Sequence, residues 1–240
     1  MRLLFIGNSH TYYNSLPELL RLLAEANGES VDYQTSFGGS YTLRDHWQGE
    51  GARLVEAGPW DAIILQPSGT EPLIHEARQT LEYAGRFAER IHQQEARCLW
   101  FMTQAYGAHS PSVRARVASM PPEAAERLEQ MDEAIEALFH EIQSAHGGEI
   151  VPVGRAWRHL QQQSAAPQLY APDGYHPAPL GSLLGAMVHY DVIFGQLPEK
   201  HPSGMSVPSE LDGFSGGRIR LNPKTGEWRS LSEATAVAIE

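Results

Sequence analysis

Short apolar runs that alternate with helical patterns constrain the fold of this chain more than any other feature. Five such runs cover residues 2–6, 31–36, 61–66, 98–103 and 149–153. Strands that alternate with helices form βαβ units, in which helices cover both faces of a parallel sheet. The sequence therefore predicts an α/β fold, a three-layer α/β/α sandwich around a flavodoxin-like five-stranded parallel sheet.

Two of the intervening helices can be read from the sequence. Ser15 and Glu18 have capping-box spacing, Pro17 lies in the first turn, and Gly28 follows the last leucine-rich turn. A later segment has apolar residues at three- and four-residue steps, namely Leu128, Met131, Ile135, Leu138, Phe139 and Ile142. This spacing predicts a surface helix with one buried stripe.

The length of 240 residues fits one main domain, which we expect over residues 1–199. Residues 200–240 are predicted to be a C-terminal extension, with a hairpin from 219 to 231 that packs on the domain or on a partner. A homo-oligomer paired through this extension remains open. Residues 104–122 form a long connection, and such loops often serve as lids or substrate walls.

Charge and apolar content exclude several kinds of partner. Lys plus Arg number 18 against 29 for Asp plus Glu, so a net charge of -11 disfavours nucleic acid. No run approaches the roughly 18 apolar residues of a membrane helix, and the first run is too short for a signal-peptide core. We expect a cytoplasmic protein without a membrane partner. The single cysteine, Cys98, is interpreted as a buried thiol.

Loops at the carboxyl ends of parallel strands commonly carry the ligand site. Three of these loops contain unusual residues, at 7–11, 36–40 and 66–70, and a fourth candidate segment covers 173–177. A serine needs a neighbouring base, usually histidine, and a third group that orients this base. Ser9 lies in a strand-to-helix turn, where backbone N–H groups can stabilise an oxyanion. Asp173 and His176 supply the other two residue types.

Taken together, Gly7-Asn8-Ser9 after the first strand, a glycine after the second, and Asp173-x-x-His176-Pro177 before the last helix resemble the SGNH (GDSL-type) hydrolases. The resemblance extends over residues 1 to about 195. Two positions depart from the family pattern. Asn8 replaces the usual aspartate, and residues 65–70 contain no asparagine where the family has Gly-x-Asn-Asp.

The resemblance implies a carboxylic ester hydrolase with Ser9 as nucleophile, His176 as general base and Asp173 as its orienting carboxylate. It further implies an oxyanion hole of the Ser9 N–H and the N–H of Gly38 or Gly39. The Gln66 amide is a candidate third donor, and its alternative role is to cap a strand end. The expected substrate is a small-molecule acyl ester, with acetyl on a carbohydrate favoured, and no cofactor is implied.

Several other residues were weighed for roles at the site. Tyr41, Trp47 and Tyr106 are candidate substrate-binding residues, and Tyr12 and His109 are weaker ones. His10 is interpreted as a pocket or surface residue rather than the base. The histidines lack the His-Glu-x-x-His spacing of zinc sites, so no metal is expected.

Two other functions remain open at this point. A turn rich in small polar residues after the first strand is also typical of a flavin-phosphate loop in a flavodoxin-like binding module. Asp173 and His176 distinguish the hydrolase from the flavin-binding module, because only the hydrolase requires them. A non-catalytic protein with the SGNH fold is the other alternative.

Overall fold

A computed structural model describes residues 1–74, 77–200, 204–206, 217–221 and 228–232 of the chain. Its centre is a sheet of five parallel strands in the order β2-β1-β3-β4-β5. The strands are β1 Arg2–Gly7, β2 Asp32–Phe37, β3 Ala62–Leu65, β4 Arg97–Phe101 and β5 Glu149–Val151. The predicted five-stranded parallel sheet is confirmed, with each strand within a few residues of its expected range.

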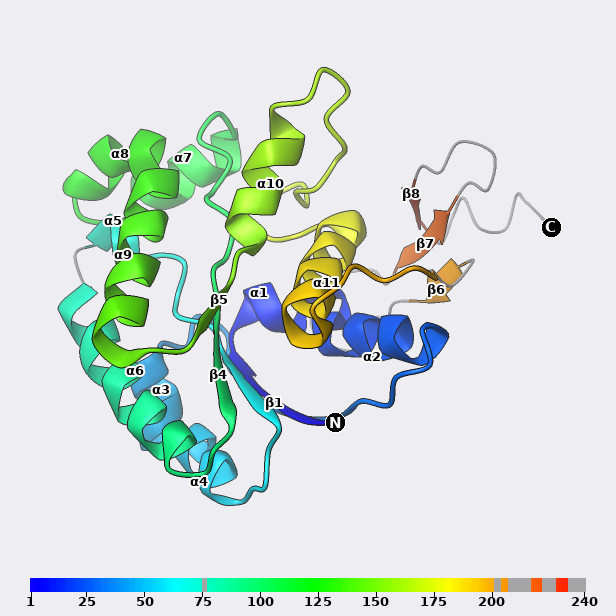
Figure 1. Cartoon of the computed structure of the whole chain (residues 1–240). Helices are drawn as coiled ribbons and strands as arrows, with labels where there is room; N and C mark the ends of the chain where they lie inside the picture. The colour runs from blue at the N-terminus through cyan, green and yellow to red at the C-terminus, as the bar shows by residue number, and fades with distance from the viewer. Residues whose placement is uncertain (75–76, 201–203, 207–216, 222–227, 233–240) are drawn as a thin grey trace.

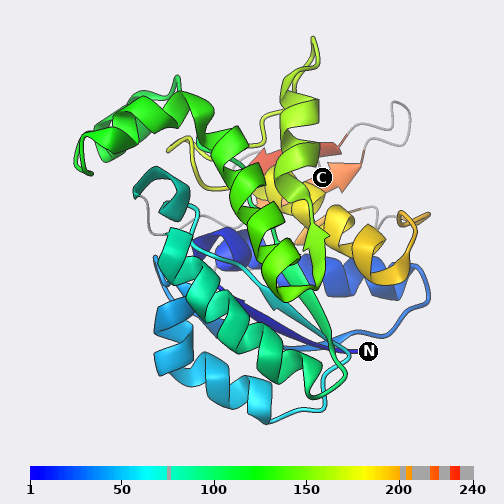
Figure 2. The ribbon, with the colours of Figure 1, turned by 60° about the vertical axis from the view of Figure 1, so that its left-hand side comes forward.

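Helices cover both faces of this sheet (Figures 1 and 2). One layer contains α2 Leu16–Ala26, α10 Val153–Gln161 and α11 Pro179–Phe194. The other contains α3 Leu43–Gln48, α4 Glu50–Glu56, α6 Ala77–His92 and α9 Met131–His146. Shorter elements lie at the carboxyl end of the sheet: α1 Ser9–Tyr12, η1 Tyr13–Ser15, α5 Glu71–Ile74, α7 Pro111–Val117, α8 Glu123–Arg127 and η2 Leu128–Gln130. The three-layer α/β/α sandwich is therefore confirmed.

Alternation along the strands divides the core into two halves. In β1, Leu4 and Ile6 face the α6 and α9 layer, whereas Leu3 and Phe5 face the α2 and α11 layer. All four side chains are almost completely buried. Successive strand side chains point to opposite faces, and a sheet covered on both sides therefore requires an unbroken apolar run. This requirement is why the strands could be recognised in the sequence.

Cys98 lies in β4 and is buried in the core half that contains α6 and α9. Burial raises the pKa of its thiol to about 12, because the thiolate loses its hydration there. The interpretation of Cys98 as a buried, unreactive thiol agrees with this environment.

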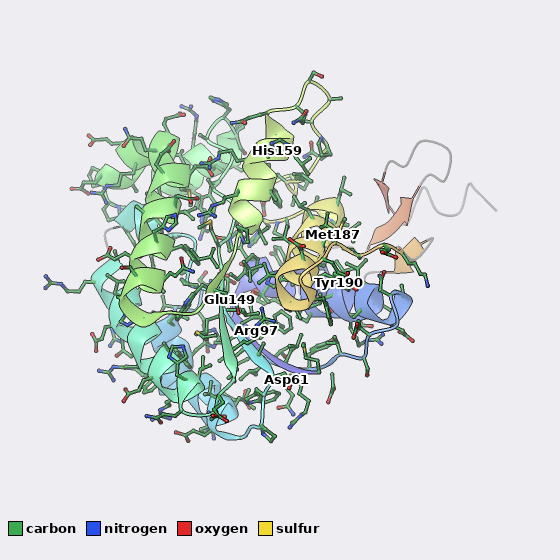
Figure 3. The ribbon with its side chains drawn as sticks, viewed as in Figure 1. Asp61, Arg97, Glu149, His159, Met187 and Tyr190 are labelled. Atoms are coloured by element: carbon green, nitrogen blue, oxygen red, sulfur yellow. The ribbon has the colours of Figure 1, made fainter. Side chains whose placement is uncertain are left out.

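An ion pair fastens the edge strand β5 to β4 at the end of the sheet away from the site. The Arg97 guanidinium donates to both carboxylate oxygens of Glu149, with Nε 2.8 Å from Oε1, and also to the carbonyls of Val192 and Ile193 at the end of α11 (Figure 3). One side chain thus joins two strands and a helix.

One local prediction, the capping box of Ser15 and Glu18, was wrong. Ser15 precedes α2 but has a left-handed backbone, with φ 49°, and caps no N–H group; Glu18 pairs instead with Arg21. The preceding Asn14 also has a positive φ and donates to the Pro177 carbonyl, so this turn is shaped by its contact with the 173–177 segment. The long connection predicted over residues 104–122 contains the short helix α7.

The C-terminal extension forms a second sheet of three antiparallel strands, β6 Gly204–Ser206, β7 Gly217–Leu221 and β8 Trp228–Ser232. β7 and β8 pair as the predicted hairpin, whose turn at 222–226 lies outside the described residues. Both strands approach α11. The boundary at 199/200 and the pairing of a second subunit through the extension stay predictions.

Within the described ranges, no helix combines the length and hydropathy needed to cross a bilayer.

Candidate active site

The turn after β1 places Ser9 at the first position of α1, above the carboxyl end of the sheet. Asn8 caps this helix: its Oδ1 accepts from the His10 N–H, and its Nδ2 donates to the Tyr41 carbonyl at 3.0 Å. A carboxylate could not make the second bond, because it has no hydrogen to donate. The asparagine that replaces the usual aspartate thus joins the loops after β1 and β2.

Asp173 is held in a tight turn between β5 and α11. Its Oδ1 accepts the N–H groups of Tyr175 and His176 at 3.1 and 3.0 Å. Gly174 has φ 79°, a conformation that favours glycine, and its carbonyl accepts from the Gly107 N–H at 2.8 Å. The 104–110 segment therefore supports the turn that presents the Asp173 carboxylate.

Ser9, His176 and Asp173 form one continuous hydrogen-bonded chain. His176 Nε2 lies 2.8 Å from Ser9 Oγ, and His176 Nδ1 lies 2.7 Å from Asp173 Oδ2. Burial raises the pKa of Asp173, but hydrogen bonds from the His176 N–H, its imidazole and the Tyr175 N–H outweigh it and hold the pKa below its usual value. An ionised Asp173 accepts from Nδ1–H, which leaves the Nε2 lone pair facing the serine hydroxyl.

A cavity of about 140 Å³ opens above Ser9 and His176. Its lining is mostly polar and includes Arg116 and the hydroxyl-bearing residues Tyr12, Tyr13, Ser40, Ser68 and Thr70. Arg116 lies over the Tyr175 ring, 4.8 Å from its centroid. Among the described residues, no three His, Cys, Asp or Glu side chains are arranged to hold a metal ion.

Gly39 lines the cavity, whereas Gly38 lies under the ring of Tyr41, which would collide with any side chain there. Of the two glycines predicted for the oxyanion hole, the position of Gly39 is therefore the suitable one. The Ser9 N–H, at the start of α1, is the other backbone candidate.

The prediction that Gln66 donates to the oxyanion does not agree with its position. Gln66 is completely buried. Its Oε1 accepts from the Asn8 N–H at 2.9 Å and the Thr11 hydroxyl at 3.0 Å, and its Nε2 donates to the Pro67 carbonyl at 2.6 Å. Its partners fix the orientation of the amide, since the N–H can only donate and the carbonyl can only accept. Gln66 supports the nucleophile turn from below.

The candidate substrate-binding residues divide into two groups. Tyr106 and Tyr12 line the cavity. Trp47 does not reach it, because its ring packs edge-on against Phe87, at 5.1 Å between centroids, and under the Arg90 guanidinium. Tyr41 is 45% exposed and lies outside the cavity lining, as does His109.

Sequence reasoning gave no role to Tyr13, Arg116 or Tyr175, which all line this cavity. The Tyr13 ring packs against the His176 imidazole at 3.9 Å between centroids, and Arg116 comes from α7, inside the segment expected to be a substrate wall. Tyr13 follows Ser9 by four residues, a helical spacing that could have indicated it.

Three buried histidines, His10, His46 and His189, should make stability sensitive to acid. Burial lowers their pKa values to about 3, 4 and 4. Between these values and the unfolded value near 6.5, only the unfolded chain binds the protons, so stability falls as the pH falls. From pH 7 to 5 we expect each histidine to cost roughly 2 kcal/mol of unfolding free energy.

Urea unfolding at both pH values measures this cost. The His189→Phe variant is the control, because it removes one of the three titrating groups and should flatten the pH dependence by about a third. An unfolding free energy equal at pH 7 and pH 5 would contradict the prediction.

Comparisons with known proteins bear on the fold. No family model and no curated protein matches this chain. Among solved structures, a candidate SGNH hydrolase from Slackia heliotrinireducens has a TM-score of 0.65 at 23% identity, with 80% of this chain and 98% of that chain covered. A DUF4886 family protein from Bacteroides uniformis has a TM-score of 0.68 at 18% identity, with 88% of each chain covered.

The acetyl xylan esterase AlAXEase has a TM-score of 0.63 at 10% identity, with 80% of this chain and 100% of that chain covered. The fold of this chain is therefore that of the SGNH hydrolases, as the resemblance implied. At these identities the likeness concerns the fold.

Proposed function

We propose that this protein is a serine esterase that hydrolyses small acyl esters, acetyl esters above all, through an acyl-enzyme on Ser9. The observation that carries the proposal is the His176 imidazole, which contacts Ser9 Oγ with one nitrogen and Asp173 Oδ2 with the other. A serine, a histidine and a carboxylate in this order have the geometry of an activated nucleophile. The shared fold with esterases supports the proposal.

In the first half of the reaction, His176 Nε2 takes the Ser9 proton as Oγ bonds to the ester carbonyl carbon. The carbonyl electron pair moves to oxygen, where the N–H groups of Ser9 and Gly39 stabilise the charge. His176 then protonates the departing alcohol oxygen as its bond to carbon breaks. In the second half, water repeats these steps, with His176 again as base, and releases the acid.

The cavity supports a small, polar substrate. Its volume of about 140 Å³ is roughly half the lower limit of pockets that take drug-sized ligands. Hydroxyl groups and the Arg116 guanidinium suit the oxygens of a carbohydrate better than a fatty chain. The names of two structural neighbours, AlAXEase and Axe2 from Geobacillus stearothermophilus, describe acetyl xylan esterases. We therefore favour an acetylated carbohydrate as the natural ester.

The flavin-binding alternative receives less support. A phosphate loop would leave its hydroxyl and N–H groups open to an anion, whereas the Ser9 hydroxyl is bonded to His176 and the Asn8 amide to the Tyr41 carbonyl. Purified protein should accordingly lack the visible absorption of a flavin.

Hydrolysis of p-nitrophenyl esters from acetyl to octanoyl tests the proposed substrate size. We expect kcat/KM to peak at acetyl and to fall by at least tenfold at octanoyl, because the cavity above Ser9 has little room for a chain. A fluorophosphonate probe, read by peptide mass spectrometry, should label Ser9. Rates that rise with chain length would contradict the small-acyl assignment, and a protein without turnover or labelling would contradict the esterase.

A further inference from the structure

His10 stands next to the nucleophile, yet the reaction above gives it no role. Its side chain is only 4% exposed and lines the cavity above Ser9. Its ring stacks on Tyr106, at 6.2 Å between centroids and 12° between planes, and lies 5.7 Å from the ring of His176. A polar side chain fixed so firmly at the cavity wall can present one defined atom to a substrate.

The hydrogen bonds of Gln104 decide which nitrogen of His10 carries the hydrogen. Gln104 Nε2 donates to the Tyr175 carbonyl at 3.0 Å and lies 3.1 Å from His10 Nδ1. Because a carbonyl can only accept, this end of the Gln104 amide is the NH2 group, and its second hydrogen points to Nδ1. Nδ1 is thus the acceptor, and a neutral His10 has its hydrogen on Nε2.

His10 is neutral at physiological pH. Burial, followed by repulsion from His176, lowers its pKa to about 3. A neutral imidazole donates a hydrogen bond without giving up its proton, as the electrophilic histidine of triosephosphate isomerase does. Within the described part of the chain, Nε2–H has no hydrogen-bond acceptor.

The Nε2 atom lies where the loop after β3 has no side chain of its own. It is 3.5 Å from the point that a Cβ atom on Gly69 would occupy. Gly69 itself lines the cavity. Gln66, directly after the same strand, uses its side-chain amide in hydrogen bonds to Asn8, Thr11 and Pro67. The β3 side of the cavity therefore lacks a side-chain amide donor. His10 Nε2 reaches this place, and the Thr103 hydroxyl lies 3.6 Å from the same point.

We propose that His10 Nε2–H is the third donor of the oxyanion hole, beside the N–H groups of Ser9 and Gly39. This inference rests on the proposed esterase function. When Ser9 Oγ bonds to the carbonyl carbon, the negative charge that develops on oxygen lies against Nε2–H, which keeps its hydrogen. The serine proton resides on His176 throughout this step.

The His10→Phe variant tests the donor, because an aromatic ring remains against Tyr106 while both nitrogen atoms are lost, Nε2 as the donor and Nδ1 as the acceptor from Gln104. We expect kcat for p-nitrophenyl acetate to fall by about 100- to 1000-fold, the usual loss for one oxyanion donor. KM should change little, and the affinity for methylboronic acid should fall with kcat, since both report the tetrahedral oxyanion. His10→Gln, which returns an N–H donor, should recover at least tenfold of the loss.

His109→Phe is the matched control, because it changes an exposed histidine outside the cavity lining, and it should keep the wild-type kcat. Melting temperatures check that each variant folds. If wild-type protein is active and His10→Phe retains a third of its kcat, or if folded His10→Gln is no better than His10→Phe, the donor role is overturned. If wild-type protein hydrolyses no ester, the proposed function fails first and this inference falls with it.

Discussion

Replacing Ser9 with alanine is expected to lower kcat for p-nitrophenyl acetate by about 10⁶-fold, the loss found when a serine protease loses its nucleophile. The hydroxyl is the atom that His176 Nε2 contacts at 2.8 Å, so the variant has a base with no nucleophile to activate. Backbone donors and the cavity remain, and they still provide some acceleration over water. The variant should therefore still bind esters, but its turnover should lie far below that of the wild-type protein.

The measurement is a progress curve for both proteins, corrected for spontaneous hydrolysis. Ser30→Ala is the control and should retain the wild-type rate, because Ser30 is an exposed serine just before β2, at the end of the sheet away from the site. A folded Ser9→Ala protein that kept more than a hundredth of wild-type kcat would show that another group attacks the ester.

The sheet was predictable because its strands obey a local rule. The strand β1 buries four consecutive side chains, alternately toward the two helical layers: Leu3, Leu4, Phe5 and Ile6. A strand buried on both faces needs apolar residues at every position, and this run is visible in the sequence. The N-terminal cap of helix α2 was predicted less well from local sequence. Serine is a common N-cap residue, but Asn14 beside Ser15 donates to the Pro177 carbonyl. This contact joins residues 163 positions apart in the sequence, so no local pattern could predict it.

The candidate triad was also accessible from sequence, for a different reason. Asp173 and His176 are close in the chain, and the turn between them forms through the Asp173 carboxylate and the backbone N–H groups of Tyr175 and His176. Ser9 could be added because parallel strands bring all carboxyl-end loops to one edge of the sheet. Local spacing and topology made these three residues candidates, and the resemblance to the SGNH hydrolases implied their roles.

Side-chain direction was the part that sequence could not supply. Gln66 follows β3 and His10 lies in α1 after β1, and no sequence pattern indicates which of these two side chains faces the cavity. Gln66 turns inward because the Asn8 N–H and the Thr11 hydroxyl need an acceptor there. His10 turns toward the cavity because Gln104 holds its Nδ1. Each orientation depends on partners from a different loop.

Trp47 illustrates the same limit on the apolar side. An aromatic residue near a sheet edge suits either a pocket or packing. Here the Trp47 ring packs edge-on against Phe87 and under the Arg90 guanidinium, both from α6. Neither partner could be assigned to Trp47 before the helices were placed.

The second large effect is expected from Asp173→Asn, which should lower kcat by about 10⁴-fold, the loss found for the same change in serine proteases. In the wild-type protein, Oδ1 accepts two backbone N–H groups and Oδ2 faces His176 Nδ1. An asparagine that keeps the two backbone bonds must point its NH2 group at Nδ1. The imidazole hydrogen then moves to Nε2, which faces Ser9. Nε2 then has no free lone pair and cannot accept the serine proton.

In Asp173→Asn we expect kcat to fall with little change in KM, because the substrate contacts of the cavity are untouched. Asp45→Asn is the matched control: Asp45 also accepts hydrogen bonds from a backbone N–H and a hydroxyl, but in the capping box of α3, away from the cavity. It should keep the wild-type kcat. A loss below tenfold in folded Asp173→Asn would mean that His176 is oriented without the carboxylate, and Asp173 would then be a structural residue of its turn.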